Sequence, residues 1–444
     1  MATPLNKNSK ILIVGGGTWG NSTALHLARR GYTDVTVLDP NTMPSAISAG
    51  NDVNKIASEG RWLEGDDIDS VHSCVSYLAG KGWLNDPVFK PYYHDTGYVV
   101  SASSPEAYER IKKKEIEPGA VKLTTAEDFR KTMPKGVLTG DFPNYTGFWQ
   151  EKGAGWVHAR KAMMSCYNEA KRLGVKYITG SPEGAVISLI DSGSDILGAK
   201  TADGKEHRAD RTILCAGANA NQLLDFKNQL RPTAWTLAHI KMTPEEVKLY
   251  KNLPVLFNVE KGFFMEPDED NHELKMCDEH PGYCNWEPAL PGQKWPQSVP
   301  VAKHQIPVAS ERRLRDFLRD IMPQLADRPF CFARVCWCAD TRDRGFLISK
   351  HPDYPSLVLG SGDAGHGYSM IPVIGSIITD CMEGVMDPRF AKAYRWRPET
   401  TQEWWGDELC DRWGAGNKVL DLKKDIAEEG WTNCPQKAAP TSKL

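Results

Sequence analysis

A glycine-rich turn between a buried strand and a helix is the feature that most constrains this fold. Residues 10–14 form an apolar, β-branched run, and Gly15 to Gly20 then match the pattern G-x-G-x-x-G. The first glycine permits a tight turn, the second lets the backbone approach a pyrophosphate, and the third allows close packing of helix on strand. Phosphates then lie at the N-terminus of the following helix, which we expect over residues 21–30, with Gly31 as its stop.

A second strand, residues 35–38, ends at Asp39, 24 positions after Gly15. An acidic side chain at this place is positioned to bind a ribose hydroxyl, which favours FAD or NAD over NADP. A strand, a glycine turn, a helix and a second strand open a doubly wound parallel sheet.

Two later glycine segments favour FAD over NAD. The strand that ends at Gly217 offers a second close approach of backbone, and the loop 360–367 offers a third, ahead of a helix near Pro372. A long flavin cofactor needs such remote contacts. The alternative for the loop 360–367 is a flexible segment with no ligand.

The order of the elements predicts an interrupted domain. We expect an α/β fold in which an FAD-binding, doubly wound (Rossmann-like) domain is interrupted by a second, α+β substrate domain with an antiparallel sheet. The predicted FAD-binding domain comprises residues 1–60, 150–230 and 330–444, and the substrate domain residues 61–149 and 231–329. A hairpin is expected where the strands 262–266 and 274–277 flank the turn residues 267–271.

Composition excludes several classes of protein. The net charge of −3 offers no basic excess for nucleic acid, and no apolar run reaches the 18 residues that a membrane span needs. The 11 cysteines argue against a disulfide scaffold and for a reducing compartment. Ser442-Lys443-Leu444 matches the peroxisomal address, so we expect a peroxisomal import receptor as partner and a peroxisomal location, otherwise a cytoplasmic one.

Two short patterns carry possible chemistry. Cys336-Trp337-Cys338 lacks the spacing and the second pair of a zinc site, so no metal is predicted, and a pair of core cysteines is the plain alternative. Lys275, Cys277 and Glu279 alternate, so a strand places them on one face. This is most often a surface ion pair, but a lysine near a flavin can stabilise negative charge as oxygen is reduced.

Long motifs show a closer likeness. The chain closely resembles the fructosyl amino acid oxidases (amadoriases), in the monomeric sarcosine oxidase family of FAD-dependent amine oxidases. The resemblance spans nearly the whole sequence and is strongest at residues 15–20, 22–32, 44–55, 85–87, 153–156, 226–232, 277–282 and 336–341.

The resemblance implies roles for individual residues. Cys336 corresponds to the cysteine that carries FAD through a thioether to the flavin 8α-carbon, and Lys275 to the lysine that activates oxygen. Lys55, which composition alone reads as a solvated charge, corresponds to a second active-site lysine. Glu279 and Arg412 correspond to residues that hold the substrate. Further contacts to the cofactor are assigned to Gly15, Gly17, Thr18, Trp19, Gly20, Asp39, Ser45, Ser48, Asn54, Lys55, Val186, Gly217, Asp363, Gly365, Gly367 and Tyr368.

One position departs from the family pattern. The family loop usually reads Gly-His-Gly-Phe-Lys, and its lysine helps to hold the substrate carboxylate. Here Ser369 stands in place of that lysine and is assigned to substrate binding. A serine donates a hydrogen bond but carries no charge, so recognition of the carboxylate is weaker or comes from elsewhere.

The implied reaction is FAD-dependent oxidation of the C–N bond of a fructosyl amino acid to an imine, which hydrolyses to glucosone and a free amino acid while O₂ becomes H₂O₂. The alternatives are another secondary amine, such as sarcosine, pipecolate or saccharopine, or a nucleotide-binding regulator without turnover. The preference for α- or ε-linked adducts or glycated peptides stays open. By resemblance we expect a monomer.

Overall fold

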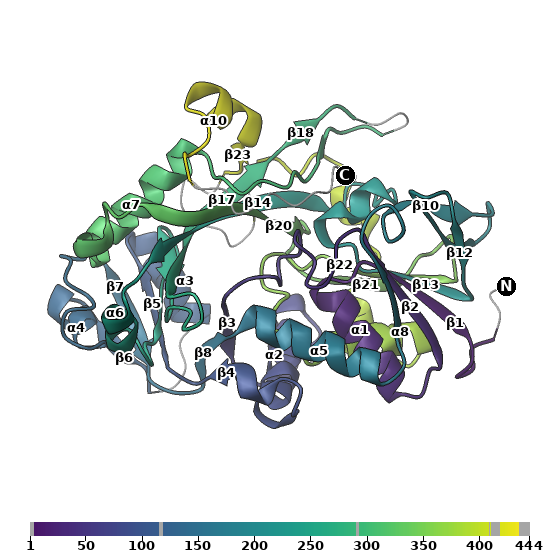
Figure 1. Ribbon diagram of the computed structural model, residues 1–444, viewed down its shortest axis with the longest axis horizontal. Coiled ribbons are helices and arrows are strands. Elements are labelled where there is room, and N and C mark those ends of the chain that lie inside the picture. The colour runs from purple at the N-terminus through teal and green to yellow at the C-terminus, as the bar shows by residue number, and fades with distance from the viewer. Residues whose placement is uncertain (1–3, 115–118, 290–292, 408, 410–417, 435–444) are drawn as a thin grey trace.

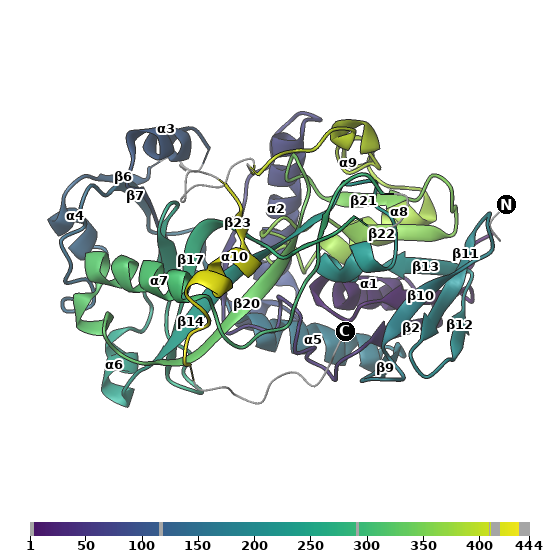
Figure 2. The ribbon, with the colours of Figure 1, turned by 90° about the horizontal axis from the view of Figure 1, so that it is seen from above.

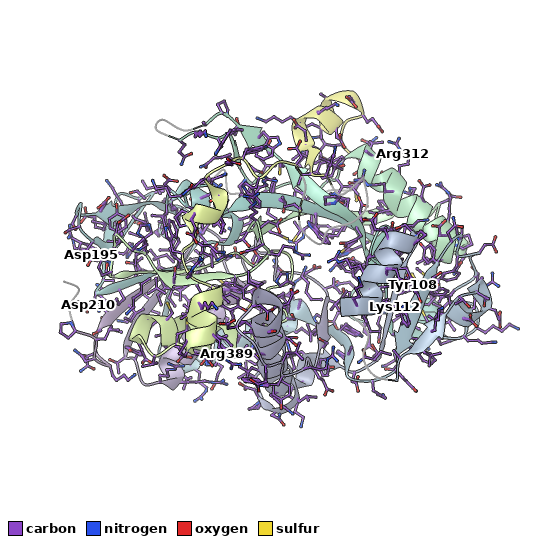
Figure 3. All side chains as sticks on the ribbon, turned by 180° about the vertical axis from the view of Figure 1, so that it is seen from behind. Tyr108, Lys112, Asp195, Asp210, Arg312 and Arg389 are labelled. Carbon is purple, nitrogen blue, oxygen red and sulfur yellow. The ribbon has the colours of Figure 1, made fainter. Side chains whose placement is uncertain are left out.

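The computed structural model describes residues 4–114, 119–289, 293–407, 409 and 418–434. Figure 1 shows two lobes, with the long strands β14, β17 and β20 running across the top of the molecule between them. Figure 2 shows these strands and the helix α7 from above. Figure 3, from behind, labels Asp195 and Asp210 at one end of the molecule, and Tyr108 and Lys112 on the other lobe.

A six-stranded sheet forms the first lobe. Its strand order is β21-β22-β13-β1-β2-β9, and every pair is parallel except β21 with β22. The predicted doubly wound sheet is therefore confirmed. The strands are β1 (Lys10–Val14), β2 (Asp34–Asp39), β9 (Lys176–Thr179), β13 (Arg211–Leu214), β21 (Leu347–Lys350) and β22 (Leu357–Ser361).

Helices α1 (Thr18–Arg29) and α8 (Ile374–Glu383) pack on this sheet, and α5 (Ala159–Arg172) packs against α1. Close packing requires glycine at two places. A Cβ on Gly20 would lie 1.8 Å from the carbonyl oxygen of Gly15, and one on Gly375 would lie 2.2 Å from the backbone of Ser22. Helix α1 therefore lies tightly against both the glycine turn and α8.

A second, mainly antiparallel sheet has the order β20-β14-β17-β16-β15-β5-β7-β6, with β23 added beside β17. The expected hairpin is confirmed, because β16 pairs antiparallel with β17 across residues 265–272. The strands are β5 (Tyr98–Ala102), β6 (Val121–Leu123), β7 (Thr146–Gln150), β14 (Arg231–Lys241), β15 (Val255–Asn258), β16 (Gly262–Phe264), β17 (Glu273–Cys284), β20 (Phe330–Asp340) and β23 (Leu420–Asp421).

Smaller elements complete the fold. Short sheets are formed by β3 (Lys55–Ser58), β8 (Ala154–Val157) and β4 (Tyr93–His94), by β10 (Val186–Asp191), β11 (Ile196–Thr201) and β12 (Glu206–Arg208), and by β18 (Trp286–Glu287) with β19 (Gln297–Ser298). The other α-helices are α2 (Ile68–Asn85), α3 (Pro105–Lys114), α4 (Ala126–Arg130), α6 (Pro244–Leu249), α7 (Val308–Ile321), α9 (Pro388–Ala393) and α10 (Leu422–Glu428).

The mixed architecture agrees with the predicted fold class, while the domain boundaries stay a prediction. Two elements show where those boundaries are least sharp. Helix α2, placed by sequence in the substrate domain, contributes Val71, Val75 and Trp83 to the same apolar cluster as Ile11 and Ile13 of β1. Strand β20, placed in the FAD-binding domain, pairs with β14 along most of its length. Within the described part of the chain, no helix combines the length and the apolar character needed to cross a membrane.

Candidate active site

A cavity of about 810 Å³ is lined by residues of both sheets. This volume lies in the range of cofactor and small-molecule sites. Its walls come from segments that are far apart in sequence. Of the residues predicted to touch cofactor or substrate, those that line it are Gly15, Gly17, Thr18, Trp19, Asp39, Ser45, Ser48, Lys55, Val186, Gly217, Glu279, Cys336, Asp363, Gly365, Gly367, Tyr368 and Ser369.

The glycine turn forms one end of the cavity. Gly15 has φ of +103°, and a Cβ there would lie 2.4 Å from the carbonyl oxygen of Cys215. Gly17 is the N-cap of α1, has no side-chain cap, and no acidic residue occupies the first turn of the helix. The helix therefore presents uncapped N–H groups and its positive dipole end to the cavity, which suits the pyrophosphate of a dinucleotide.

Asp39, at the end of β2, is buried in the wall beside this turn. Its Oδ2 accepts a hydrogen bond from the Gly16 N–H at 2.9 Å, and its Oδ1 accepts one from the Asn41 N–H at 2.9 Å. Burial raises the pKa of Asp39, although these hydrogen bonds oppose the rise. The carboxyl group lies where the ribose of a nucleotide is expected, and it also fixes the glycine turn.

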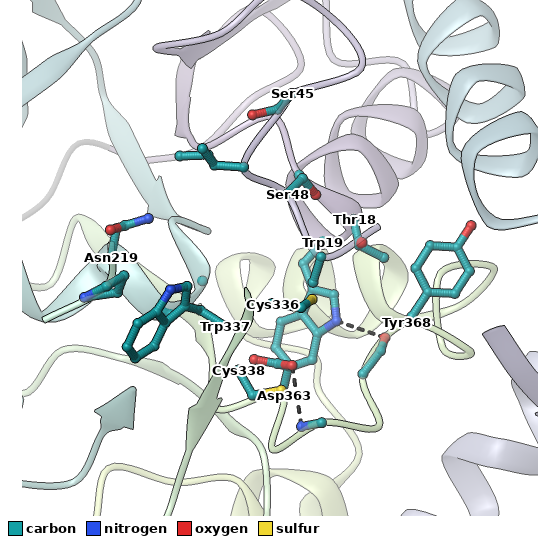
Figure 4. Close-up of a pocket in the computed structure, with 18 of the residues that line it drawn as sticks. Thr18, Trp19, Ser45, Ser48, Asn219, Cys336, Trp337, Cys338, Asp363 and Tyr368 are labelled. Atoms are coloured by element: carbon teal, nitrogen blue, oxygen red, sulfur yellow. Dashed lines mark hydrogen bonds between the residues drawn. The ribbon is translucent and has the colours of Figure 1, made fainter. Parts of the chain in front are cut away.

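The loop after β22 closes the same end. Trp19 donates from Nε1 to the carbonyl oxygen of Gly367 at 3.0 Å, and Asp363 accepts a hydrogen bond from the Ala339 N–H at 2.8 Å (Figure 4). Gly365 has φ of +81°. The loop is therefore tied to both α1 and β20 and forms a wall of the cavity.

The second sheet contributes one face of three neighbouring strands. In register, Trp235 of β14 pairs with Cys336 of β20, and Leu237 and His239 of β14 pair with Cys277 and Lys275 of β17. Directly paired residues share a face of the sheet. All twelve residues of β17 are buried, although five of them carry a carboxylate, ammonium or imidazole group: Glu273, Lys275, Asp278, Glu279 and His280. Burial of polar groups costs folding free energy unless each has a partner. So many of them on one strand indicate a functional role for β17.

Lys275 and Lys55 meet at one carboxylate. The Asp52 Oδ2 accepts a hydrogen bond from Lys275 Nζ at 2.7 Å and another from Lys55 Nζ at 2.6 Å. Lys275 also donates to the backbone oxygen of Asn54 at 2.8 Å. The Lys275 side chain is 1% exposed and does not line the cavity, whereas Lys55 does. Sequence reasoning brought the two lysines to the site but missed the aspartate that joins them.

Neighbouring charges determine the protonation states of Asp52 and Lys55. Burial alone would raise the pKa of Asp52, but Lys275, Lys55 and Arg334 hold it well below its usual range. Burial would lower the pKa of Lys55, but Asp52 raises it above its usual value. Burial raises the pKa of the neighbouring Cys277 thiol to about 12. Lys55 and Asp52 are therefore both charged near neutral pH.

Cys336 lies next to this cationic group on β20, and Figure 4 shows it with Cys338 and Trp337 in the cavity wall. Arg334, two residues earlier on the same face, places Nη2 3.8 Å from the Cys336 Sγ and is 6% exposed. Sequence reasoning did not single out Arg334, although its spacing from Cys336 was sufficient to find it.

Besides Lys275, three other predicted site residues are not among those that line the cavity. Gly20 packs against the Gly15 backbone, and Asn54 is buried with its amide donating to the Glu266 backbone oxygen, so neither lines the cavity. Arg412 lies outside the described residues, as do Ser442, Lys443 and Leu444.

The far end of the cavity was missed by sequence reasoning. Phe257 and Phe263 of the antiparallel sheet line it together with Arg110 of α3, whereas His72 of α2 lines the cavity beside the loop after β22, with its ring 4.4 Å from that of His366. Burial lowers the pKa of His72 to about 4, so this imidazole is neutral at physiological pH. Aromatic rings beside cations suit a polar organic substrate, and no sequence motif marked these residues.

One group of possible metal ligands lies away from the cavity. His158, Asp268 and Asp270 place ligand atoms within 4.8 Å of one another. Lys161 already pairs with Asp270 at 2.6 Å, and Asn271 donates to Asp268 from both backbone and side chain. These carboxylates therefore have partners of their own, and the group supports no metal assignment.

Comparison with known proteins adds to this geometry. The model of the family described as FAD dependent oxidoreductase matches residues 10–381. The crystal structure of fructosyl amine: oxygen oxidoreductase (Amadoriase I) from Aspergillus fumigatus is 54% identical, covers 98% of this chain and 100% of its own, and superposes with a TM-score of 0.94. That of fructosamine oxidase (Amadoriase II), a deglycating enzyme of the same organism, is 52% identical over 98% and 99% of the two chains, with a TM-score of 0.90. L-Saccharopine oxidase of Schizosaccharomyces pombe is 27% identical over 93% and 97%.

Proposed function

Because the chain belongs to the FAD-dependent oxidoreductase family and, within it, to the amadoriases, we propose that it oxidises fructosyl amino acids with FAD and molecular oxygen. The observation that carries the proposal is the single cavity that joins the glycine turn of α1 to the cationic face of β17 and β20. A nucleotide site and a positively charged reaction site are thereby continuous.

The proposed reaction removes two electrons and two protons from the substrate. The secondary amine that links the 1-deoxyfructosyl group to the amino acid becomes an imine, and O₂ accepts the electrons and protons to give H₂O₂. Water then adds to the imine and releases glucosone and the amino acid. Bound FAD supplies the two-electron chemistry of this exchange, and the protein supplies orientation and electrostatics.

Different residues of the cavity would bind the cofactor, stabilise charge and bind the substrate. The N-terminus of α1 and the backbone of the glycine turn would hold the pyrophosphate, with Asp39 near the ribose. Lys275, Lys55 and Arg334 place positive charge where negative charge develops as oxygen is reduced, and this electrostatic effect needs no rearrangement during the reaction. Glu279, on the same face of β17, lines the cavity and would bind a hydroxyl or the amine of the sugar adduct.

We also propose that Cys336 carries the flavin through a thioether. Its place in the cavity wall, next to Arg334, supports this assignment.

Oxidation of another secondary amine is the second candidate. It is favoured by the relative named L-saccharopine oxidase and by Ser369, which leaves the cavity without the lysine that the family pattern has there. A panel of fructosyl-valine, fructosyl-lysine, sarcosine, pipecolate and saccharopine, assayed by coupled detection of H₂O₂, distinguishes the two. Highest kcat/KM on a fructosyl adduct is expected, and highest kcat/KM on one of the other amines would overturn the proposal.

Import into peroxisomes through Ser442-Lys443-Leu444 remains a proposal that rests on sequence, as does the monomeric state. An enzyme that makes H₂O₂ is suited to a compartment that destroys it. A fluorescent fusion with and without the tripeptide tests the location, and light scattering at several concentrations tests the oligomeric state.

A further inference from the structure

The buried carboxylate of Asp52 holds two lysines at once. Its Oδ2 accepts from Lys55 and from Lys275, so the two ammonium nitrogens can lie no further apart than the sum of those two short distances. The other carboxylate oxygen, Oδ1, accepts from the Val53 N–H at 2.8 Å. Two like charges so close together in a buried site repel strongly unless an anion lies between them.

We propose that Asp52 is a positioning residue that keeps Lys275 charged and aimed at the site of oxygen reduction, with Lys55 as the third member of the unit. This inference rests on the proposed function, since it assigns Lys275 to the oxidative half of that reaction. Asp52 does not line the cavity, so it acts through the lysines and not on the substrate.

Lys275 depends on this carboxylate more than Lys55 does. The Lys275 side chain is 1% exposed and that of Asp52 is 2% exposed, whereas that of Lys55 is 21% exposed. Water can therefore stabilise the Lys55 ammonium but not that of Lys275. A buried ammonium without a counter-ion gives up its proton more readily, because burial disfavours the charged form.

The surroundings supply one further cation, Arg334, and among the described contacts no carboxylate besides Asp52 is bonded to either lysine. Arg334 and Cys336 face the unit from β20, Cys277 from β17 and Tyr368 from the loop after β22. His239 of β14 is bonded to Glu273 at 2.8 Å, and burial lowers its pKa. In an Asp52→Asn variant the positive groups would thus lose their central anion.

The test is the pH dependence of flavin reoxidation by O₂, measured by stopped flow after anaerobic reduction. In the wild type, the rate is expected to be flat from about pH 6 to 9, because the raised pKa of Lys55 and the lowered pKa of Asp52 lie outside this range. In Asp52→Asn, the rate should fall by about ten-fold across the same range as Lys275 deprotonates. Asp52→Glu, which retains the charge, should keep the flat profile.

Asp278→Asn is the matched control. Asp278 is a fully buried carboxylate on the same strand as Lys275 but on its opposite face, paired with Arg313 at 2.8 Å. This variant should lower stability and leave the pH profile flat. An Asp52→Asn profile that is flat, or a fall of equal steepness in Asp278→Asn or Asp52→Glu, would overturn the proposal.

Two further measurements separate positioning from a structural role. Nuclear magnetic resonance of ε-¹³C-labelled lysine, assigned with Lys275→Met, should show Lys275 titrating at lower pH in Asp52→Asn than in the wild type; an unchanged titration contradicts the proposal. The double variant Asp52→Asn/Lys275→Met should reoxidise as slowly as Lys275→Met alone, whereas additive losses would show that Asp52 acts independently.

If Asp52→Asn does not load FAD, Lys55→Met decides the matter, because it leaves Asp52 with Lys275 as its sole lysine partner in the described structure. A flat profile in Lys55→Met supports the proposal, and a fall with rising pH contradicts it. The substrate panel is independent of all these variants. If it fails while the wild type still reoxidises with a flat profile, the error lies in the proposed substrate and not in the role of Asp52.

Discussion

The indole N–H of Trp19, in the first turn of α1, donates to the carbonyl oxygen of Gly367, 348 positions later in the chain, at 3.0 Å. This bond joins the nucleotide end of the cavity to the loop that also carries Tyr368 and Ser369. A Cβ on Gly367 would lie 3.0 Å from the same indole nitrogen, so the contact requires both the tryptophan and the glycine.

Trp19→Phe keeps an aromatic ring and removes the donor. We expect the melting temperature of the FAD-loaded protein to fall by a few degrees, because an unmet buried acceptor costs about 1 to 3 kcal/mol. Differential scanning calorimetry of the loaded protein measures this loss. An unchanged melting temperature would show that the Trp19–Gly367 bond contributes nothing to holding the loop.

Lys275→Met should separate the two halves of the reaction. Removing the buried cation should slow flavin reoxidation by about 100-fold or more, since one electrostatic group of this kind is typically worth that much, while anaerobic reduction by substrate changes far less. Stopped-flow spectroscopy follows both steps. Lys261→Met, which removes a lysine paired with Asp320 away from the cavity, is the control. A variant that is slow in reduction and normal in reoxidation would remove the assignment.

Cys336→Ala tests the covalent link. Acid precipitation of the wild type should give a yellow pellet and a colourless supernatant, and the variant should release its flavin into the supernatant. Cys338→Ala, two residues further along the same face of β20, should still give a yellow pellet. Free flavin in the wild-type supernatant, or a yellow pellet from Cys336→Ala, would contradict the thioether at Cys336.

Ser369→Lys restores the residue type of the family pattern. A lysine at this position of the cavity wall should lower KM for fructosyl-valine about ten-fold through a charge-assisted hydrogen bond to the carboxylate, with kcat little changed. Ser369→Ala serves as the control, because the wild-type hydroxyl donates only to the His366 oxygen, at 3.3 Å, among the described contacts. If KM does not fall in Ser369→Lys, the substrate carboxylate is bound elsewhere.

Two glycine variants should fail in different ways. The Cβ of Gly20→Ala would meet the Gly15 oxygen at 1.8 Å, so the turn must shift, and we expect a loss of several kcal/mol and poor folding. The Cβ of Gly17→Ala meets only Ser48, at 3.2 Å, so this variant should fold but bind less FAD. Thermal unfolding and the ratio of absorbance at 450 and 280 nm distinguish these outcomes; equal losses in both variants would refute the distinction.

Sequence periodicity identified the parallel sheet well, because its strands are short, apolar and followed by glycine or aspartate, as at Val14 and Leu38. The domain to which α2 belongs stays a prediction. The Val71 and Trp83 side chains suit either core, and only tertiary packing decides that they lie with β1. No strand was predicted around Cys336, and the pairing of β20 with β14 is a long-range choice that no local pattern carries.

The candidate site, too, could be predicted from the sequence only where local patterns determine it. Alternation along β17 predicted that Lys275, Cys277 and Glu279 share a face, because the period of a strand is local. The link from Lys275 to Asp52 spans 223 positions, and no local pattern carries it. Arg110 and His72 join the cavity from two separate helices, so only the folded chain reveals them.

The position of β22 has a consequence for how the molecule is made. Strand β22 (Leu357–Ser361) pairs with β13 (Arg211–Leu214), which in turn pairs with the first strand, β1. A growing chain therefore cannot complete the nucleotide-binding sheet until more than three quarters of it has been synthesised, while β1, α1 and β2 have long been available. The site for the cofactor is accordingly complete only late in synthesis. Until then, the strands that have already been made have one unpaired edge.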